Sequence, residues 1–376
     1  MATSNEDIRD ALIRRQTRTI KAGVSIGREM QRLLGKVDGD LRRLIEQGVD
    51  PVTGRRVKFG KTRTARLQAI QKAIRELQRP TYKEIRAALK ESVVEIGTLE
   101  AAFAAETVTA ALPVTVNLAL PSSALLRTIA TSKPFQGKLL SRWVSELETR
   151  DATRMMDQIR IGMVEGEGTE QIARRVFGTA QQGFNNGTRA LTKRDIEGIT
   201  RTAVNFMTNQ GRQEMYLANK ALIPEELYVA TLDNRTTILC QGLDGKRFKV
   251  GEGPTPPVHF RCRSLRVPVI NGKVAGTRPA KGVIKSDLEG LSKKEQRDTI
   301  ARLTGNVPAS ETYTKFLRKQ PVAFQNEVLG KTRATLFRKG GIPLDAFTDA
   351  QGKQFTLKAL RGDHPEAFIR AGLQNE

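Results

Sequence analysis

The chain has 376 residues, and its 63 Lys and Arg outnumber its 40 Asp and Glu, which gives a formal net charge of +23. This excess indicates a polyanionic partner, most commonly the phosphate backbone of nucleic acid, with an acidic membrane surface or an acidic protein as alternatives. Aromatic residues make up only 5% of the chain, too few for a protein that stacks single-stranded bases on aromatic platforms, and the two cysteines exclude a disulfide-rich secreted scaffold.

Residues 1–105 are predicted to form a basic helical N-terminal region. Ser4 and Asp7 have the capping-box spacing of a helix start, and Gly and Pro within 48–54 predict a turn. Apolar residues at helical spacing predict a helix over 62–79. A separate helix is expected to begin after Pro80, because proline usually interrupts a helix.

The stretch 52–90 has the most one-sided charge of the chain and predicts a surface that faces phosphates. Contacts are expected with the nucleic-acid backbone rather than with bases, so binding should depend on salt and little on sequence. A solvated helix face is the alternative explanation. The predicted nucleic-acid-binding residues are Arg55, Arg56, Lys58, Lys61, Arg63, Arg66, Lys72, Arg75 and Arg79.

Residues 106–133 are predicted to form a partly extended segment. Its stretch Thr107 to Leu126 carries no charge and is long enough to span a bilayer. Pro113, Pro121 and nearby polar residues argue against a stable membrane span. We therefore expect a buried segment, with extended pieces around 114–120.

Residues 134–270 are predicted to form one domain in which helices precede a small sheet. A long helix is expected to end near Asn219. Strands are predicted at 227–233 and 260–270, and the Asp-Gly turn within 243–250 predicts a hairpin. The expected fold class is α+β, a mostly helical chain with a small antiparallel sheet after a long helix. A linker over 271–285 and a C-terminal helical extension over 286–376 are expected to follow.

Both cysteines and one of the two histidines lie between residues 233 and 263. Cys240, His259 and Cys262 are of the types that bind zinc, and folding can bring the two ends of a hairpin together. A closed structural zinc site needs a fourth ligand, and Thr237 stands three residues before Cys240, where a cysteine would be expected. We therefore expect no cofactor and plain packing of the cysteines, with zinc or a disulfide as alternatives.

Several motifs follow one another in order through this part of the chain: RT…N on a helix, then D-x-R-T-x-x-x-C, L-D-G-K-x-F, P-P-x-H and C-R before a V-P strand. The residues that form them are Arg201, Thr202, Asn205, Asp233, Arg235, Thr236, Cys240, Leu243, Asp244, Gly245, Lys246, Phe248, Pro256, Pro257, His259, Cys262, Arg263 and Pro268. This pattern resembles the phage head morphogenesis family, the minor head proteins similar to the F protein of phage Mu. The resemblance covers roughly residues 120 to 362. Many relatives have further cysteines where this chain has Thr237 and Ser264.

The resemblance implies a structural, non-enzymatic protein of the capsid interior that aids prohead assembly, and DNA packaging or ejection through non-specific DNA contacts. The implied partners are the phage portal protein and packaged double-stranded DNA, with the scaffolding or major capsid protein as a further candidate. The implied location is the virion, preceded by the host cytoplasm during assembly. No catalytic residue is carried over from the family.

Two other functions are considered. His259 with Asp244 or Asp233 has the residue types of a metal-dependent nuclease, although the second histidine, His364, lies in a polar tail. A host chromatin or RNA-binding protein would need a recognisable reading module, and none is visible in the sequence. Arg235 and Arg263 are expected to hold carboxylates such as Asp233 and Asp244 rather than phosphate.

Overall fold

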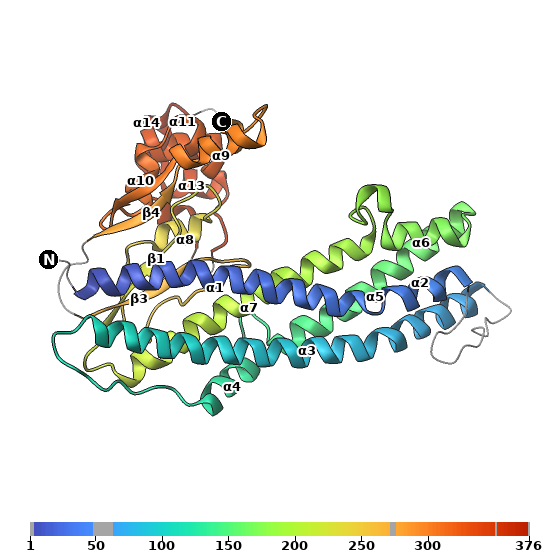
Figure 1. Cartoon of the computed structure of the whole chain (residues 1–376). Helices are drawn as coiled ribbons and strands as arrows, with labels where there is room; N and C mark the ends of the chain where they lie inside the picture. The colour runs from blue at the N-terminus through green and yellow to red at the C-terminus, as the bar shows by residue number, and fades with distance from the viewer. Residues whose placement is uncertain (1–3, 48–62, 271–275, 350–351, 375–376) are drawn as a thin grey trace. The chain divides into compact units, whose positions relative to one another are not determined.

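The computed structural model describes residues 4–47, 63–270, 276–349 and 352–374 (Figure 1). Most of these residues are helical, and two small antiparallel sheets follow the long helices. The predicted α+β class is confirmed. The turn predicted at 48–54 lies outside the described residues.

The helices differ widely in length, and three of them have more than thirty residues. The α-helices are α1 Ser4–Gly35, α2 Asp38–Gln47, α3 Arg63–Ala110, α4 Ser123–Ser132, α5 Leu140–Glu165, α6 Thr169–Phe177, α7 Thr188–Ala218, α8 Ile238–Leu243, α9 Lys293–Arg302, α10 Tyr313–Lys319, α11 Val322–Leu329, α12 Lys331–Thr335, α13 Leu357–Asp363 and α14 Pro365–Ala371. The strands are β1 Glu225–Val229, β2 Arg247–Lys249, β3 Leu265–Val269, β4 Thr277–Lys281 and β5 Thr304–Pro308.

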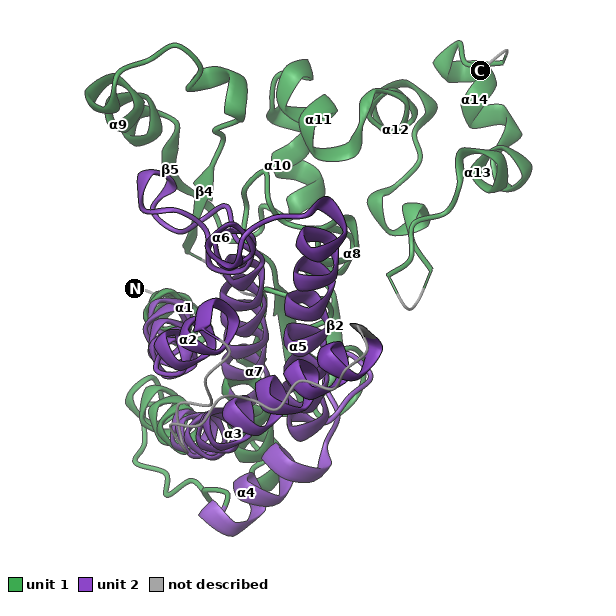
Figure 2. Ribbon diagram, turned by 90° about the vertical axis from the view of Figure 1, so that its right-hand side faces the viewer, with its two compact units in different colours: residues 1–18, 98–121, 208–376 green, residues 19–97, 122–207 purple. Residues whose placement is uncertain are grey.

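The chain divides into two compact units that are interleaved in sequence (Figure 2). Unit 1 comprises Met1–Arg18, Thr98–Pro121 and Thr208–Glu376. Unit 2 comprises Thr19–Gly97 and Ser122–Met207. The long helices α1, α3 and α7 each contribute residues to both units, so the units do not follow the linear order of the regions expected from the sequence.

Unit 2 is all-helical, and α3 contributes to both of its hydrophobic clusters. Ile74 packs in one cluster, and Tyr82 and Ile85 pack in the other, all fully buried. The expected break at Pro80 is wrong, because α3 continues through this residue. A proline inside a helix costs about 3 kcal/mol. Each large apolar side chain buried around it contributes about 1.5–3 kcal/mol, so packing outweighs the local penalty.

Unit 1 contains a three-stranded sheet in the order β2-β1-β3, with both pairings antiparallel. The predicted strands at 227–233 and 260–270 correspond to β1 and β3 with shifted bounds. The hairpin predicted at 243–250 is wrong, because the residues before the turn form helix α8 and β2 pairs with β1. Leu239 and Leu243 are four residues apart, a helical spacing that the turn motif concealed.

The segment expected to be a linker, 271–285, contains strand β4. Its residues Thr277–Lys281 pair antiparallel with Thr304–Pro308 of β5. The Gly, Lys and Pro content that suggested a linker is compatible with a two-stranded sheet of short strands, where proline occupies positions that need no ladder donor. Residues 271–275 lie outside the described part of the chain.

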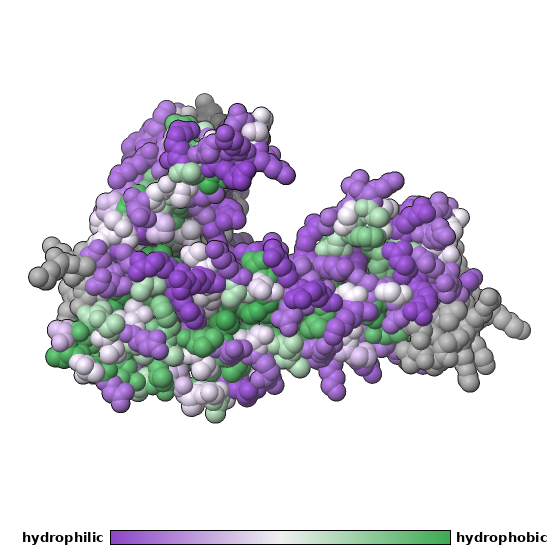
Figure 3. All heavy atoms as spheres, viewed as in Figure 1, coloured by the Kyte–Doolittle hydropathy of each residue, from purple (hydrophilic) through white to green (hydrophobic). Residues whose placement is uncertain are grey.

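The uncharged stretch Thr107 to Leu126 is mostly exposed, so the expectation of a buried segment is wrong. Residues 115–120 belong to no strand, and Val114 and Leu120 are 64% and 54% exposed. The backbone N–H of Ala119 donates to Asn219 Oδ1 at 3.0 Å, and Asn219 Nδ2 donates to the Ala119 carbonyl at 2.9 Å, which holds the segment at the surface of unit 1. Figure 3 shows hydrophobic residues at the surface over this end of α3. Within the described residues, no helix has the length and apolar character that crossing a membrane requires.

Candidate functional site

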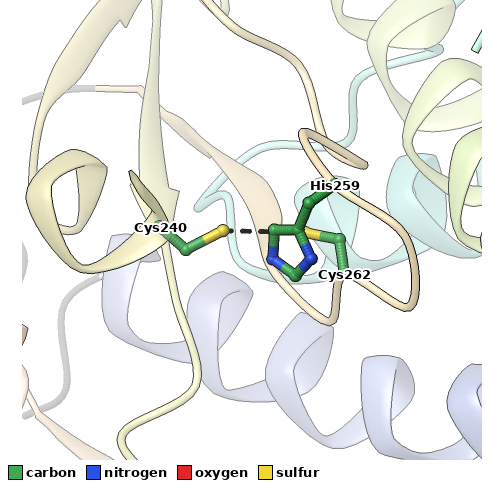
Figure 4. A group of neighbouring side chains, drawn as sticks. All are labelled: Cys240, His259 and Cys262. Atoms are coloured by element: carbon green, nitrogen blue, oxygen red, sulfur yellow. Dashed lines mark hydrogen bonds between the residues drawn. The ribbon is translucent and has the colours of Figure 1, made fainter. Parts of the chain in front are cut away.

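The structure brings Cys240, His259 and Cys262 together in unit 1 (Figure 4). Cys240 lies on α8, and the other two side chains come from the turn that precedes β3. The possible ligand atoms of the three side chains lie within 4.8 Å of one another, and the two sulfur atoms are 3.8 Å apart. Neither thiol forms a disulfide, and both are buried. The sequence identified these three residues correctly as neighbours.

The pKa values of the two cysteines shift in opposite directions. The hydrogen bond to Cys262, together with burial, raises the pKa of the Cys240 thiol well above its ordinary value. Burial opposes ionisation of Cys262, but hydrogen bonds from Cys240 and His259 outweigh it and hold the pKa of Cys262 well below the ordinary value. Burial likewise opposes protonation of His259, yet its contact with Cys262 raises the pKa of the imidazole.

Asp233 and Arg263 form the support on one side of this cluster. Arg263 donates from Nη1 and Nη2 to the two carboxylate oxygens of Asp233 at 2.5 and 2.8 Å. Burial raises the pKa of Asp233, but the hydrogen bonds and charge of Arg263 outweigh it, so the net pKa is lowered. Thr236 also donates to Asp233 at 3.1 Å. Arg235 is 74% exposed, and its nearest nitrogen is as far as 3.8 Å from the same carboxylate. Arg263 is therefore the arginine that holds Asp233.

Asp244 holds together parts of unit 1 that are far apart in sequence. Its carboxylate accepts from the backbone N–H groups of Ala230 and Tyr313, both at 2.7 Å, and from both terminal nitrogens of Arg278, at 2.9 and 3.0 Å. The next residue, Gly245, has φ +83°, and a Cβ there would lie 2.6 Å from Thr312. Arg278 is a partner that sequence reasoning missed, because it falls in the segment expected to be a linker.

The two carboxylates proposed for a nuclease are thus both engaged by arginines. Among the described residues, no Asp or Glu side chain joins the Cys240, His259 and Cys262 group. The arrangement offers a set of soft ligands rather than the oxygen-rich set typical of Mg²⁺-dependent nucleases.

Phe248 supports a third ion pair, between Glu226 of β1 and Arg266 of β3. Both charged side chains are buried, and their nearest atoms are 3.1 Å apart. The Arg266 guanidinium lies 4.9 Å from the centre of the Phe248 ring. Burial raises the pKa of Glu226 to about 7, although Arg266 and the Gly251 N–H oppose the shift.

This raised pKa predicts a pH dependence of stability. Between about pH 4.5 and pH 7 the folded state binds a proton on Glu226 that the unfolded state releases, so the free energy of unfolding should fall as pH rises through this window and level off above it. The fall should be at most about 3 kcal/mol. Urea unfolding of the wild type and of Glu226→Gln across this range measures it, because the variant should lack this component of the slope.

The slope, rather than absolute stability, is the quantity to compare, because Glu226→Gln also leaves Arg266 without its carboxylate at every pH. Glu225→Gln is the matched control on the same strand, where the side chain is exposed and pairs with Arg247 at 3.4 Å. If Glu225→Gln flattened the profile as much as Glu226→Gln, the slope would not originate at Glu226.

Two buried networks on the long helices were not predicted from the sequence. In unit 2, Asp151 of α5 accepts from Gln78 at 2.5 Å, Tyr82 at 2.9 Å and Thr192 at 2.8 Å, and it pairs with Arg189. In unit 1, Glu100 pairs with Arg212 at 2.5 Å and with Arg15 at 2.7 Å. From sequence alone a charged residue is expected at the surface, because the partner that allows its burial is not known.

The family-motif residues of α7 have structural contacts. Arg201 pairs with Glu197 at 3.0 Å, and the buried hydroxyl of Thr202 donates to the Gly198 carbonyl at 2.7 Å. Asn205 is also buried. These residues belong to the helix and its packing rather than to the cysteine cluster.

The predicted nucleic-acid-binding residues are only partly described. Arg55, Arg56, Lys58 and Lys61 lie outside the described residues, and Arg63 is described only as the first residue of α3. Arg66, Lys72, Arg75 and Arg79 are exposed on α3. The structure therefore supplies an exposed basic surface on α3 in unit 2, although whether it binds nucleic acid stays a prediction.

Residues 153–266 match the model of the family described as Phage Mu protein F like protein. The matched range begins in α5, includes all of α7 and α8, and ends at Arg266 in β3. The resemblance inferred from the motifs is confirmed over this range. Residues 153–266 therefore carry a Phage Mu F-like domain, which supports a phage head morphogenesis protein. Searches of the curated proteins and of the solved structures found no match.

Proposed function

We propose that this chain is a non-enzymatic minor head protein that lies inside the phage head near the portal and contacts packaged double-stranded DNA. The family match supports a role in head morphogenesis, and the net charge of +23 supports a location among phosphates. The portal protein is the proposed protein partner, with the scaffolding or major capsid protein as a further candidate. Assembly would take place in the host cytoplasm.

The observation that carries the DNA contact is a row of basic residues on α3. The spacing of three or four residues keeps them along one side of the helix. We call them the α3 cationic row: Lys72, Arg75, Arg79, Lys83, Arg86 and Lys90. Glu76 lies on the same side and pairs with Lys72 at 3.9 Å, whereas Glu84, Glu91 and Glu95 fall on a different side when the helix is wound at about 3.6 residues per turn. With six cations against one carboxylate, the row presents a locally positive surface.

The middle of this row is available to a ligand. Arg75, Arg79 and Lys83 are exposed, and none of them forms a salt bridge within 4.0 Å with any residue in the described part of the chain. Lys83, Arg86 and Lys90 also line a cavity of about 390 Å³ with residues of α4 and α5 in unit 2. Exposed cations in a row suit phosphate contacts, which need charge but no base recognition.

The salt dependence of DNA binding tests this assignment. We expect the full chain to bind double-stranded DNA of unrelated sequences with similar affinity. Log K should fall linearly with log salt, by about 0.9 for each phosphate neutralised. Replacing Arg75, Arg79 and Lys83 together by Gln should reduce this slope by about 2–3, as measured by fluorescence anisotropy across salt concentrations.

The matched control replaces Lys293, Lys294 and Arg297 of α9 in the same way. These side chains are also exposed, and their replacement removes the same charge. This control should change the slope much less. Equal effects of the two triple variants on the slope would show that the salt dependence comes from net charge and not from the α3 cationic row. Absence of binding by the wild type at low salt would contradict the DNA contact itself.

A further inference from the structure

We propose that Cys240, His259 and Cys262 bind a zinc ion that ties helix α8 to the turn before β3. Cys240 lies on α8, whereas His259 and Cys262 lie near the end of the long loop that follows β2. This loop, residues 250–264, contains no strand or helix, so an ion there would fix a segment that regular hydrogen bonding does not. The site is independent of the proposed DNA contact, which lies on α3.

The separation of the two sulfur atoms fits a shared tetrahedral ion. Two thiolates that each lie about 2.3 Å from a tetrahedral zinc ion are about 3.8 Å apart. Cys240 Sγ and Cys262 Sγ are 3.8 Å apart. A disulfide needs about 2.05 Å, and neither cysteine forms one. The backbone therefore already holds the two thiols at the distance that zinc coordination requires.

His259 is held with one ring nitrogen available as a ligand. Its Nδ1 lies 2.8 Å from the carbonyl oxygen of Phe260. Because a carbonyl oxygen only accepts, Nδ1 must carry the hydrogen, which leaves the lone pair on Nε2. A backbone carbonyl that fixes the tautomer in this way is a recurring feature of zinc-bound histidines. The turn itself is closed by the Cys262 N–H donating to the His259 carbonyl at 3.2 Å.

The surroundings supply a second set of contacts and one open position. The hydroxyl of Tyr228 lies 3.3 Å from Cys240 Sγ, close enough to donate to a thiolate. Among the described residues, no further His, Cys, Asp or Glu side chain joins the three ligands. His259 is only partly buried, whereas both cysteines are buried. The fourth position is therefore assigned to a water molecule that reaches the ion from the side of His259.

Metal content of the purified full chain tests the site. After incubation with zinc under reducing conditions and dialysis, we expect about one zinc ion per chain by plasma mass spectrometry. Cys240→Ser and His259→Ala should each weaken zinc affinity by at least about tenfold. His364→Ala is the matched control, because it removes the other histidine of the chain, and it should retain full zinc content.

Thiol protection supplies a readout that needs no variant. Zinc should slow alkylation of Cys240 and Cys262 in the folded wild type, and a chelator should restore the rate. Substoichiometric zinc in the wild type, zinc loss in His364→Ala equal to that in His259→Ala, or alkylation rates indifferent to zinc would each overturn the proposal. Recovery of a Cys240–Cys262 disulfide that excludes zinc would also overturn it.

Discussion

Replacing Asp244 by Ala should lower the free energy of unfolding of unit 1 by about 3–5 kcal/mol. The substitution leaves the Arg278 guanidinium buried without its carboxylate. It also removes the acceptor for the backbone N–H groups of Ala230 and Tyr313. Burying an unpaired charge costs more free energy than the ion pair contributes. Most of the lost stability should therefore come from the unpaired Arg278 guanidinium and the unsatisfied N–H groups.

Hydrogen exchange by mass spectrometry can localise this loss, because peptides of β1, β4 and α10 should lose protection together. Asp345→Ala is the matched control, since Asp345 is 48% exposed and pairs with Lys246 at 2.7 Å. An exposed pair contributes at most about 1 kcal/mol. Similar protection in Asp244→Ala and Asp345→Ala would show that the Asp244 contacts do not carry the stability assigned to them.

Replacing Asp151 by Ala should destabilise unit 2 by about 3–5 kcal/mol. Asp151 is fully buried and accepts from side chains of α3 and α7, including the guanidinium of Arg189. Arg189 keeps its contacts to Asp38 and to the Leu34 carbonyl, both at 2.7 Å. These remaining contacts should hold the effect below that of a completely isolated buried charge.

The single tryptophan of the chain makes this measurement selective. Trp143 lies on α5 and packs against a hydrophobic cluster of unit 2, so its fluorescence during urea unfolding reports on that unit. Asp157→Ala is the matched control on the same helix, where the carboxylate is exposed and pairs with Arg160 at 3.2 Å. An unchanged midpoint in Asp151→Ala would mean that the network is dispensable.

Patterns that depend on neighbouring residues were predicted well from the sequence. The periodicity of α7 and the alternation around β1 depend on spacing within a short stretch. The grouping of Cys240 with the H-x-x-C turn was expected from a hairpin, but helix α8 and the loop after β2 bring these residues together instead. The class of the fold followed from these elements, because long helices before short strands indicate α+β. The family motifs add to this reading, and the match over residues 153–266 confirms the resemblance.

Features that depend on distant partners were not predictable in this way. Arg278 lies 34 residues from Asp244, in a stretch whose composition suggested a linker. Pro80 marks a break by local rules, yet packing on both sides carries α3 through it. Composition also predicted burial for Thr107 to Leu126, but composition does not specify which surface a segment meets. In each case the local structure is determined by interactions with residues that are remote in sequence.

The interleaved order of the units has a consequence for synthesis on the ribosome. Unit 2 has all of its residues once position 207 has been made. Ile8 and Leu12, by contrast, are buried in a cluster with Leu265 and Val267. These two side chains must therefore wait for Leu265 and Val267 while some 250 further residues are added, although Ala101 and Val108 of the same cluster are made earlier. During that interval the cluster is incomplete, and its apolar surface is open to a chaperone or an early head-assembly partner.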